Sequence, residues 1–199
     1  MISPRTVRSV TWFRYSVLAT VVLVTAVPAA AESLNARLRG EFAFTQIHFC
    51  ATTNVPGEDF VGPNLRVPPG GVNMSTRSNE GFLTFDGAGA GSFDGRTLTM
   101  THNAGPGTVP MTEVGFTCPL TYNVEADGSF TTELVCVDSA GQPILTGIHL
   151  RGQLQDGGRL LIASDTTRNV ETVITPAGVS KRICGRSQTA IRTRVSGGE

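Results

Sequence analysis

The sequence predicts an all-β domain, an antiparallel up-and-down barrel of eight or nine strands that carries two disulfides. Apolar and polar residues alternate with a period of two after residue 31, and no segment there keeps an apolar period of about 3.6 residues over three turns. Asp-Gly dipeptides interrupt these runs at 86–87, 94–95, 127–128 and 156–157, and they supply the positive φ that tight hairpins need. Barrel closure removes exposed strand edges, and a two-sheet β-sandwich is the alternative.

Nine strands are expected from the alternating runs. They cover residues 40–49, 80–86, 91–101, 113–124, 129–138, 144–154, 159–164, 169–175 and 180–193. The segment 51–79 is rich in proline and glycine, and no strand is predicted in it. An irregular stretch of this length is typical of a lid, a binding loop or a disordered segment. An ordered cover over a barrel mouth and a flexible loop are both open at this stage.

Residues 1–31 are predicted to be a cleavable signal peptide. Three arginines and no acidic residue precede an apolar run at 17–27, and Ala29 and Ala31 fit the A-x-A cleavage rule. An eleven-residue helix rises only about 16 Å, about half of a bilayer core, so a retained membrane anchor is disfavoured. Residues 32–199 are then a single exported domain, periplasmic or extracellular, with no membrane span.

Removal of this leader changes the charge of the chain. The three leader arginines leave 13 of the 16 basic residues against 16 acidic ones, a formal charge of about −3. A basic nucleic-acid surface is therefore not implied. The leader also takes away Trp12 and Tyr15, so Tyr122 is the one tyrosine of the mature chain.

One hairpin can be assigned residue by residue. If residues 125–128 form a type I turn with Gly128 left-handed, opposed residues have numbers that sum to 254. Cys118 then faces Cys136, close enough for a disulfide, since opposed Cβ atoms lie about 4.5 to 5.5 Å apart. The other pairs on that face are Leu120 with Leu134, Tyr122 with Thr132, and Val124 with Phe130.

Cys50 pairs with Cys184 by elimination, which joins the first strand to the last. All four cysteines lie in the part predicted to be exported, where an oxidising compartment favours disulfides. Cys50 shares its face with Phe42 and Phe44, whereas Cys184 alternates with arginines, so a bulge or bend is expected at one strand end.

Conventional catalytic and cofactor signatures are absent from the sequence, including G-x-S-x-G, H-E-x-x-H, C-x-x-C, the P-loop and G-x-G-x-x-G. We therefore expect no catalytic residue and no cofactor. His48 and His102 fall on the expected inward face, with Leu98 and Met100 beside His102, and His149 falls outward. None is spaced with other ligands for a metal, so no metal site is predicted.

Arginines are concentrated near the carboxyl end of the chain. The basic residues there are Lys181, Arg182, Arg186, Arg192 and Arg194. The simpler interpretation places them on the solvated outer face of the last strand. A sharper hypothesis stacks one guanidinium across the barrel floor on an aromatic of the first strand, such as Phe42.

Four sequence segments resemble those of a group of exported bacterial proteins without an assigned function. They are Gly40-Glu41-Phe42-Ala43-Phe44-Thr45, Cys118-Pro119-Leu120-Thr121-Tyr122, Ala126-Asp127-Gly128-Ser129-Phe130 and Arg182-Ile183-Cys184-Gly185-Arg186-Ser187. This resemblance implies a shared fold and no activity. The layout is also similar to the calycin, lipocalin-like barrels, in which a glycine, a spacer and a tryptophan stand where this chain has Gly40, Glu41 and Phe42. That resemblance implies an architecture only.

We favour a non-enzymatic protein whose barrel binds a small apolar ligand under the 51–79 segment. The side chains expected to line it are Phe42, Phe44, Phe85, Met100, Phe116, Leu120, Tyr122, Phe130 and Leu134. A structural or protein-interaction module of the cell envelope, with a filled barrel, is the alternative. A third hypothesis is an isomerase or cyclase that uses Tyr122, His48, His102 or Glu41 as an acid or base.

Overall fold

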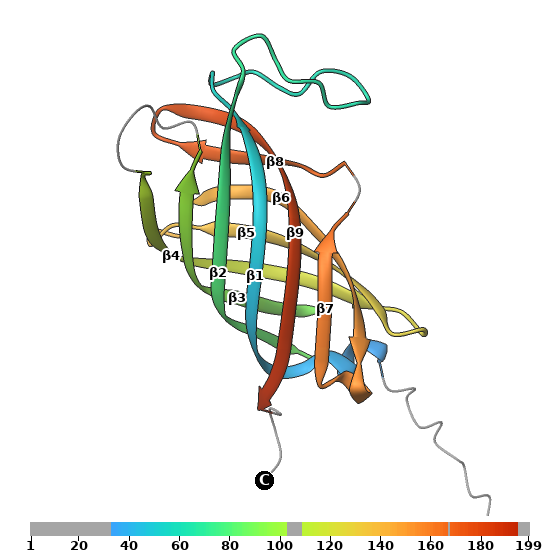
Figure 1. Cartoon of the computed structure of the whole chain (residues 1–199). Coiled ribbons are helices and arrows are strands. Elements are labelled where there is room, and N and C mark those ends of the chain that lie inside the picture. Colours follow the sequence, from blue (N-terminus) through green and yellow to red (C-terminus); the bar gives the residue numbers. More distant parts are fainter. Residues whose placement is uncertain (1–32, 103–108, 167, 195–199) are drawn as a thin grey trace, which may run out of the picture. The chain divides into compact units, whose positions relative to one another are not determined.

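Antiparallel strands wrap into a closed barrel in the computed structural model, which describes residues 33–102, 109–166 and 168–194 (Figure 1). The strands are β1 (Arg39–Thr53), β2 (Val72–Asp86), β3 (Ala90–Thr101), β4 (Met111–Val124), β5 (Ser129–Val137), β6 (Pro143–Gln155), β7 (Leu160–Asp165), β8 (Val170–Thr175) and β9 (Gly178–Arg194). Two short 3-10 helices, η1 (Leu34–Leu38) and η2 (Asp156–Gly158), accompany them. The predicted signal peptide lies outside the described residues.

Strand β1 closes the ring by pairing with both β2 and β9. Strands β7 and β8 both lie between β6 and β9, and each pairs with both neighbours. The result is a closed eight-strand barrel with one additional strand. The all-β barrel prediction is confirmed, and the sandwich alternative is not needed.

The β4–β5 hairpin has the predicted register. Leu120 pairs with Leu134, and Val124 pairs with Phe130. Gly128 adopts a φ of 82° in the turn, and its N–H donates to the carbonyl of Glu125 at 3.0 Å. The predicted disulfide between Cys118 and Cys136 joins the two strands. A local turn rule was sufficient here because every inward residue of the hairpin is apolar or half-cystine except Thr132.

The second disulfide joins Cys50 on β1 to Cys184 on β9, as predicted. The prediction of a bulge or bend beside these cysteines is wrong. Cys50 and Cys184 are directly paired, and the β1–β9 register is unbroken from 42 to 52. The register shift lies between Glu41 and Phe42 instead. Both arginines that alternate with Cys184 face inward instead. Arg182 and Arg186 are buried, so the prediction of a solvated outer face is also wrong for them.

Strand β2 begins at Val72, so the predicted irregular segment 51–79 is too long. Residues 72–79 pair with β1 throughout. They escaped prediction because the side chains that face inward there, Ser75, Arg77 and Asn79, are polar. The alternation of apolar and polar residues that identifies a half-buried strand is therefore missing.

The irregular segment that remains, 54–71, is held by its own hydrogen bonds. Asn54 donates from Nδ2 to the carbonyl of Gly70 at 3.0 Å, and the N–H of Gly71 donates to Pro68 at 2.9 Å. The N–H of Gly57 reaches the carbonyl of Val179 at 2.8 Å, which ties the segment to the start of β9. In Figure 1 it projects beyond the ends of β1 and β2.

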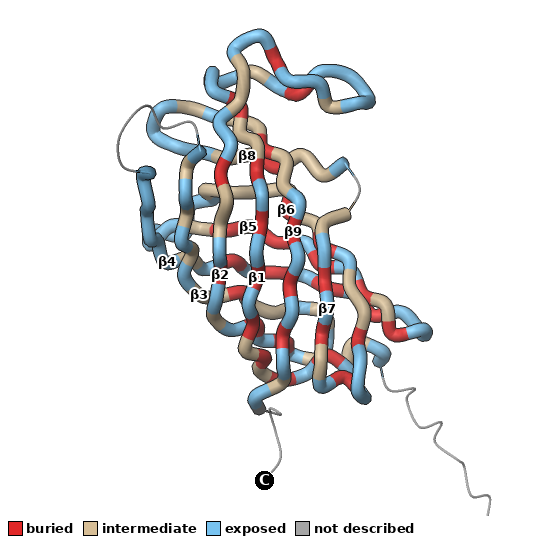
Figure 2. Tube along the Cα trace, viewed as in Figure 1, coloured by how far each residue is buried: buried red, intermediate tan, exposed pale blue. Residues whose placement is uncertain are grey.

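The lower half of the barrel in Figure 1 holds an apolar core. Figure 2 shows buried and less buried residues alternating along the strands that surround it. Leu38 of η1 is fully buried at this end, and the rings of Phe42, Phe85 and Tyr122 pack edge to face. The guanidinium of Arg192 lies 5.0 Å from the centre of the Phe42 ring, which confirms the predicted stacking.

Candidate functional site

The upper half of the interior, near the Cys50–Cys184 disulfide, is polar. We call it the polar half, and its inward-facing residues are Gln46, His48, Ser75, Arg77, Asn79, Thr97, Thr99, Arg182, Arg186 and Gln188. One row runs from Gln188 through Gln46 to Asn79 across β9, β1 and β2. Gln46 donates from Nε2 to Gln188 at 2.8 Å and accepts at Oε1 from Asn79 at 3.0 Å.

A buried ion-pair network lies beside this row. The carboxylate of Glu171 on β8 is fully buried and binds two guanidiniums, those of Arg182 and Arg186. Arg182 donates from Nε to Oε2 of Glu171 at 2.7 Å. Arg186 also pairs with Asp165 at the end of β7. The network therefore connects β7, β8 and β9, where two strands share one place in the ring.

Burial and mutual repulsion shift the pKa values of these groups. Burial lowers the pKa of Arg182, and Arg186 lowers it further, while Glu171 acts in the opposite direction. Burial also raises the pKa of Asp165, against the effect of Arg186. Burial is the main cause that lowers the pKa of His48 to about 3, with added repulsion from the nearby arginines, so its imidazole is neutral at neutral pH.

Arg77 is the member of the polar half whose charge is not balanced. It faces His48 across β1 and β2, and it forms no ion pair within the described part of the chain. Its Nε atom is buried without a hydrogen-bond acceptor among those residues. Burial lowers the pKa of Arg77 to about 10, and repulsion from Arg182 contributes. The polar half therefore holds three guanidiniums, those of Arg77, Arg182 and Arg186, against the two carboxylates of the network.

The residues predicted to line a ligand cavity fall into two groups. Seven of them are buried in the apolar core: Phe42, Phe44, Phe85, Leu120, Tyr122, Phe130 and Leu134. Phe116 packs against this core and is partly buried. Met100 is not with them, because the inward face of β3 is the one that carries Phe93. Met100 and Leu98 lie on the outer wall, where their side chains are exposed.

The apolar core leaves little open space. The void bounded by Leu83, Phe85, Phe130, Leu161 and neighbouring side chains measures about 10 Å³. A volume of about 10 to 15 Å³ is the least that holds one water molecule. The side chains of the lower half therefore fill the space between the strands.

The remaining predicted groups are scattered. His48 is buried, whereas His102 follows β3 and its Nε2 lies 2.6 Å from Oγ1 of Thr76 on the exposed side. His149 lies on the outward face of β6, as predicted. Glu41 accepts from the hydroxyl of Thr193 at 3.0 Å near the opposite end of β1. The structure does not bring His48, His102, Tyr122 and Glu41 together as acid and base groups.

Sequence reasoning missed the acidic members of the network, Glu171 and Asp165, and placed its arginines outside. One signal was available. Cys184 must face inward to reach Cys50, and in a strand the residues two positions away share that face, so Arg182 and Arg186 also face inward. No sequence pattern identifies Glu171 as their partner.

The outer wall of the polar half carries apolar side chains. We call this set the outer patch, and it consists of Ile47, Phe49, Met74, Leu98, Met100 and Met111. Phe49 pairs with Thr76, Thr76 with Met100, and Met100 with Met111, so the patch crosses β1 to β4. A groove of about 350 Å³ beside Phe49 is lined also by Leu65, Ile183 and Cys184.

Within residues 33–102, 109–166 and 168–194, neither short helix has the length and apolar character needed to cross a membrane. Comparisons of the chain with protein-family models, with curated proteins and with solved structures found no match. The eight-strand antiparallel ring is consistent with a calycin-like layout. The two disulfides fit a compartment that is oxidising rather than cytoplasmic.

Proposed function

We propose that the protein is an exported, non-enzymatic binding protein that takes up a small anion in the polar half of its barrel. The observation that carries the proposal is Arg77, a partly buried guanidinium that has no ion pair within the described residues. A charge withdrawn from water is costly unless it is paired. An anion beside Arg77 would offset that cost.

The ligand expected here is a carboxylate or a phosphate. A guanidinium binds either group through two parallel hydrogen bonds. Thr97 adds a buried hydroxyl that has no partner among the described side chains, and it lies on β3 opposite Asn79 on β2. A long apolar tail is not expected, because the core below leaves only about 10 Å³.

Calorimetric titration tests this proposal, with inorganic phosphate, sulfate, acetate and citrate as probes. We expect saturable binding of at least one anion with one site per chain, weakened by added salt. Arg77→Gln should weaken it at least tenfold. Arg96→Gln is the matched control, because Arg96 is an exposed arginine of the neighbouring strand that pairs with Glu80 and Glu113.

Absence of saturable binding for all four anions would contradict the proposal, as would unchanged binding in Arg77→Gln. A fluorescent fatty-acid probe added to the same protein tests the apolar-ligand hypothesis. Saturable binding of that probe, unaffected by Arg77→Gln, would favour that hypothesis instead.

The outer patch favours a second function, that of an interaction module. Phe49 is 63% exposed, and Met111 is 56% exposed. Several exposed apolar side chains on one face of a barrel are typical of an interaction site. We infer that the patch binds a second copy of the chain. Sedimentation velocity over a range of concentrations should show self-association that Phe49→Ser reduces; a monomer at every concentration would refute this function.

A further inference from the structure

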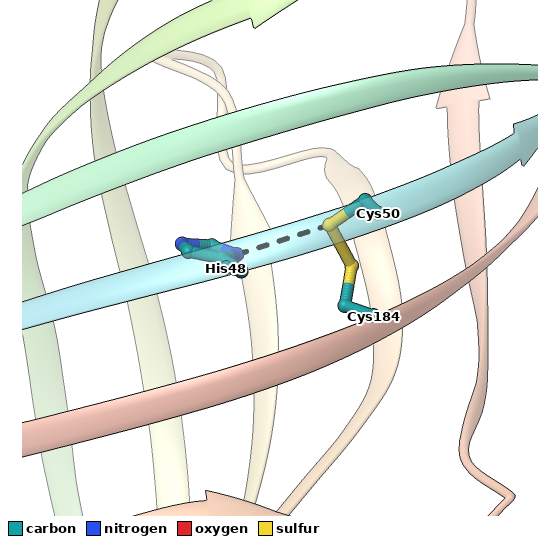
Figure 3. A group of neighbouring side chains, drawn as sticks. All are labelled: His48, Cys50 and Cys184. Atoms are coloured by element: carbon teal, nitrogen blue, oxygen red, sulfur yellow. Dashed lines mark hydrogen bonds between the residues drawn. A yellow bond between two sulfur atoms is a disulfide. The ribbon is translucent and has the colours of Figure 1, made fainter.

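His48 lies next to the Cys50–Cys184 disulfide on the inner wall of the barrel (Figure 3). Nδ1 of His48 is 4.0 Å from Sγ of Cys50. The three possible ligand atoms of His48, Cys50 and Cys184 all lie within 4.8 Å of one another. Ligand atoms of a tetrahedral zinc site are about 3.3 to 3.8 Å apart, given Zn–N of about 2.0 Å and Zn–S of about 2.3 Å. Small side-chain movements would bring all three atoms onto one ion.

We propose that reduction of the Cys50–Cys184 disulfide creates a binding site for Zn²⁺, with Nδ1 of His48 and the two cysteine sulfurs as ligands. A dithiol reductant breaks the S–S bond, supplies two electrons and two protons, and is itself oxidised to a disulfide. Zn²⁺ then replaces the two thiol protons, which are released to solvent. Three protein ligands leave one position for water, as in zinc sites that keep an open coordination position.

The charges around the disulfide are compatible with this exchange. Arg182 and Arg186 flank Cys184 on the same face of β9, and Oε2 of Glu171, which Arg182 binds, lies 3.9 Å from Sγ of Cys184. Neighbouring guanidiniums stabilise a thiolate relative to a thiol. Two thiolates and one Zn²⁺ add no net charge, so the ion-pair network would keep the balance that it has around the disulfide.

The two disulfides differ in their surroundings. Cys184 is only partly buried, and it lines the groove of about 350 Å³ beside Phe49. The other disulfide lacks these features. Cys118 and Cys136 are buried in the apolar core, and among the described residues no group of three candidate ligands includes either of them.

The test uses the full chain with Cys118→Ala and Cys136→Ala, so that the Cys50–Cys184 pair is the only source of thiols. After reduction with a phosphine, competition with a chromogenic chelator should show one Zn²⁺ per chain. Co²⁺ should give a sulfur-to-metal charge-transfer band. The oxidised chain should bind at least tenfold more weakly, and so should reduced His48→Gln.

Wild-type protein provides a second measurement if that variant does not fold. In reduced wild type, Zn²⁺ should slow the alkylation of Cys50 and Cys184 and leave the slower alkylation of the buried Cys118 and Cys136 unchanged, as read by peptide mass. Equal protection of all four cysteines overturns the proposal, and so does unchanged binding in His48→Gln. Loss of β circular dichroism on reduction that Zn²⁺ does not reverse also overturns it. Anion binding by the oxidised protein is unaffected by any of these outcomes.

Discussion

His48 and Arg77 lie directly opposite each other on β1 and β2, with both side chains inside the barrel. The interior changes from apolar to polar between Phe44 and this pair. Two rows further down β1 the inward residue is Phe44, which belongs to the apolar core, whereas Arg186 stands beside His48 on β9. Arg186 is paired with Glu171 and Asp165, whereas Arg77, on the other side of the neutral imidazole, has no ion pair among the described residues.

Glu171→Gln should destabilise the fold by roughly 3 to 5 kcal/mol, because it leaves two buried guanidiniums without their shared carboxylate. Denaturant unfolding followed by circular dichroism measures the change. Glu113→Gln is the comparison, since Glu113 forms an exposed ion pair with Arg96 and should lose less than about 1 kcal/mol. Equal losses of unfolding free energy in the two variants would mean that the buried network stabilises the fold no more than an exposed ion pair does.

The lower half of the barrel followed from the sequence because two simple rules apply there. Inward residues of the β4–β5 hairpin are mostly apolar, and the turn contains Gly128 in the left-handed region. These two facts set the register, and the register sets the disulfide between Cys118 and Cys136. The stacking of Arg192 on Phe42 also followed, because both residues lie at the end of the barrel where the first and last strands meet.

The polar half could not be predicted by those rules, since its alternation is reversed. Thr97 and Thr99 face inward on β3, while Leu98 and Met100 face outward. A rule that places apolar residues inside therefore assigns the wrong face. Only the known tertiary contact, the pairing of Cys50 with Cys184, carries information about this end of the barrel, and it fixes the faces of β1 and β9 alone.

Arg77→Gln should raise stability in the absence of anions, on the order of 1 kcal/mol, because it removes a partly buried charge that has no carboxylate partner in the described structure. Thermal unfolding in a buffer without phosphate or carboxylates measures this. Addition of the anion that binds should stabilise wild type and leave the variant unchanged. A variant less stable than wild type under these conditions would show that Arg77 has a structural partner.

Gly152→Ala should destabilise the barrel by about 1 to 3 kcal/mol. An added Cβ at Gly152 on β6 would lie 2.3 Å from Cζ of Phe130 and 2.4 Å from the carbonyl oxygen of Ile162, and the latter belongs to the backbone. Gly185→Ala is the control, because a Cβ there meets nothing within 4 Å. Denaturant midpoints compare the two, and a neutral Gly152→Ala would mean that the Phe130 ring can move away at no cost.

Because the Tyr122 hydroxyl is buried, the free energy of unfolding should fall as the pH rises above about 10. This hydroxyl donates to the carbonyl of Leu38 at 3.1 Å and accepts from the N–H of Gly87 at 2.8 Å. Burial raises the pKa of Tyr122 to about 12, and the charge of Asp86 contributes. Between about 10 and 12 the unfolded chain is therefore deprotonated while the folded chain keeps its proton, so unfolding is favoured as the pH increases.

Tyrosinate absorbance measures this pKa directly in a chain that carries Tyr15→Phe, where Tyr122 is the one tyrosine left. The midpoint should lie near 12 in the folded protein and near 10 in denaturant. Tyr122→Phe should remove this part of the alkaline loss of stability, although it also removes the contact with Leu38. A folded-state midpoint near 10 would place the hydroxyl in water, and it would contradict the packing of η1 against this end of the barrel.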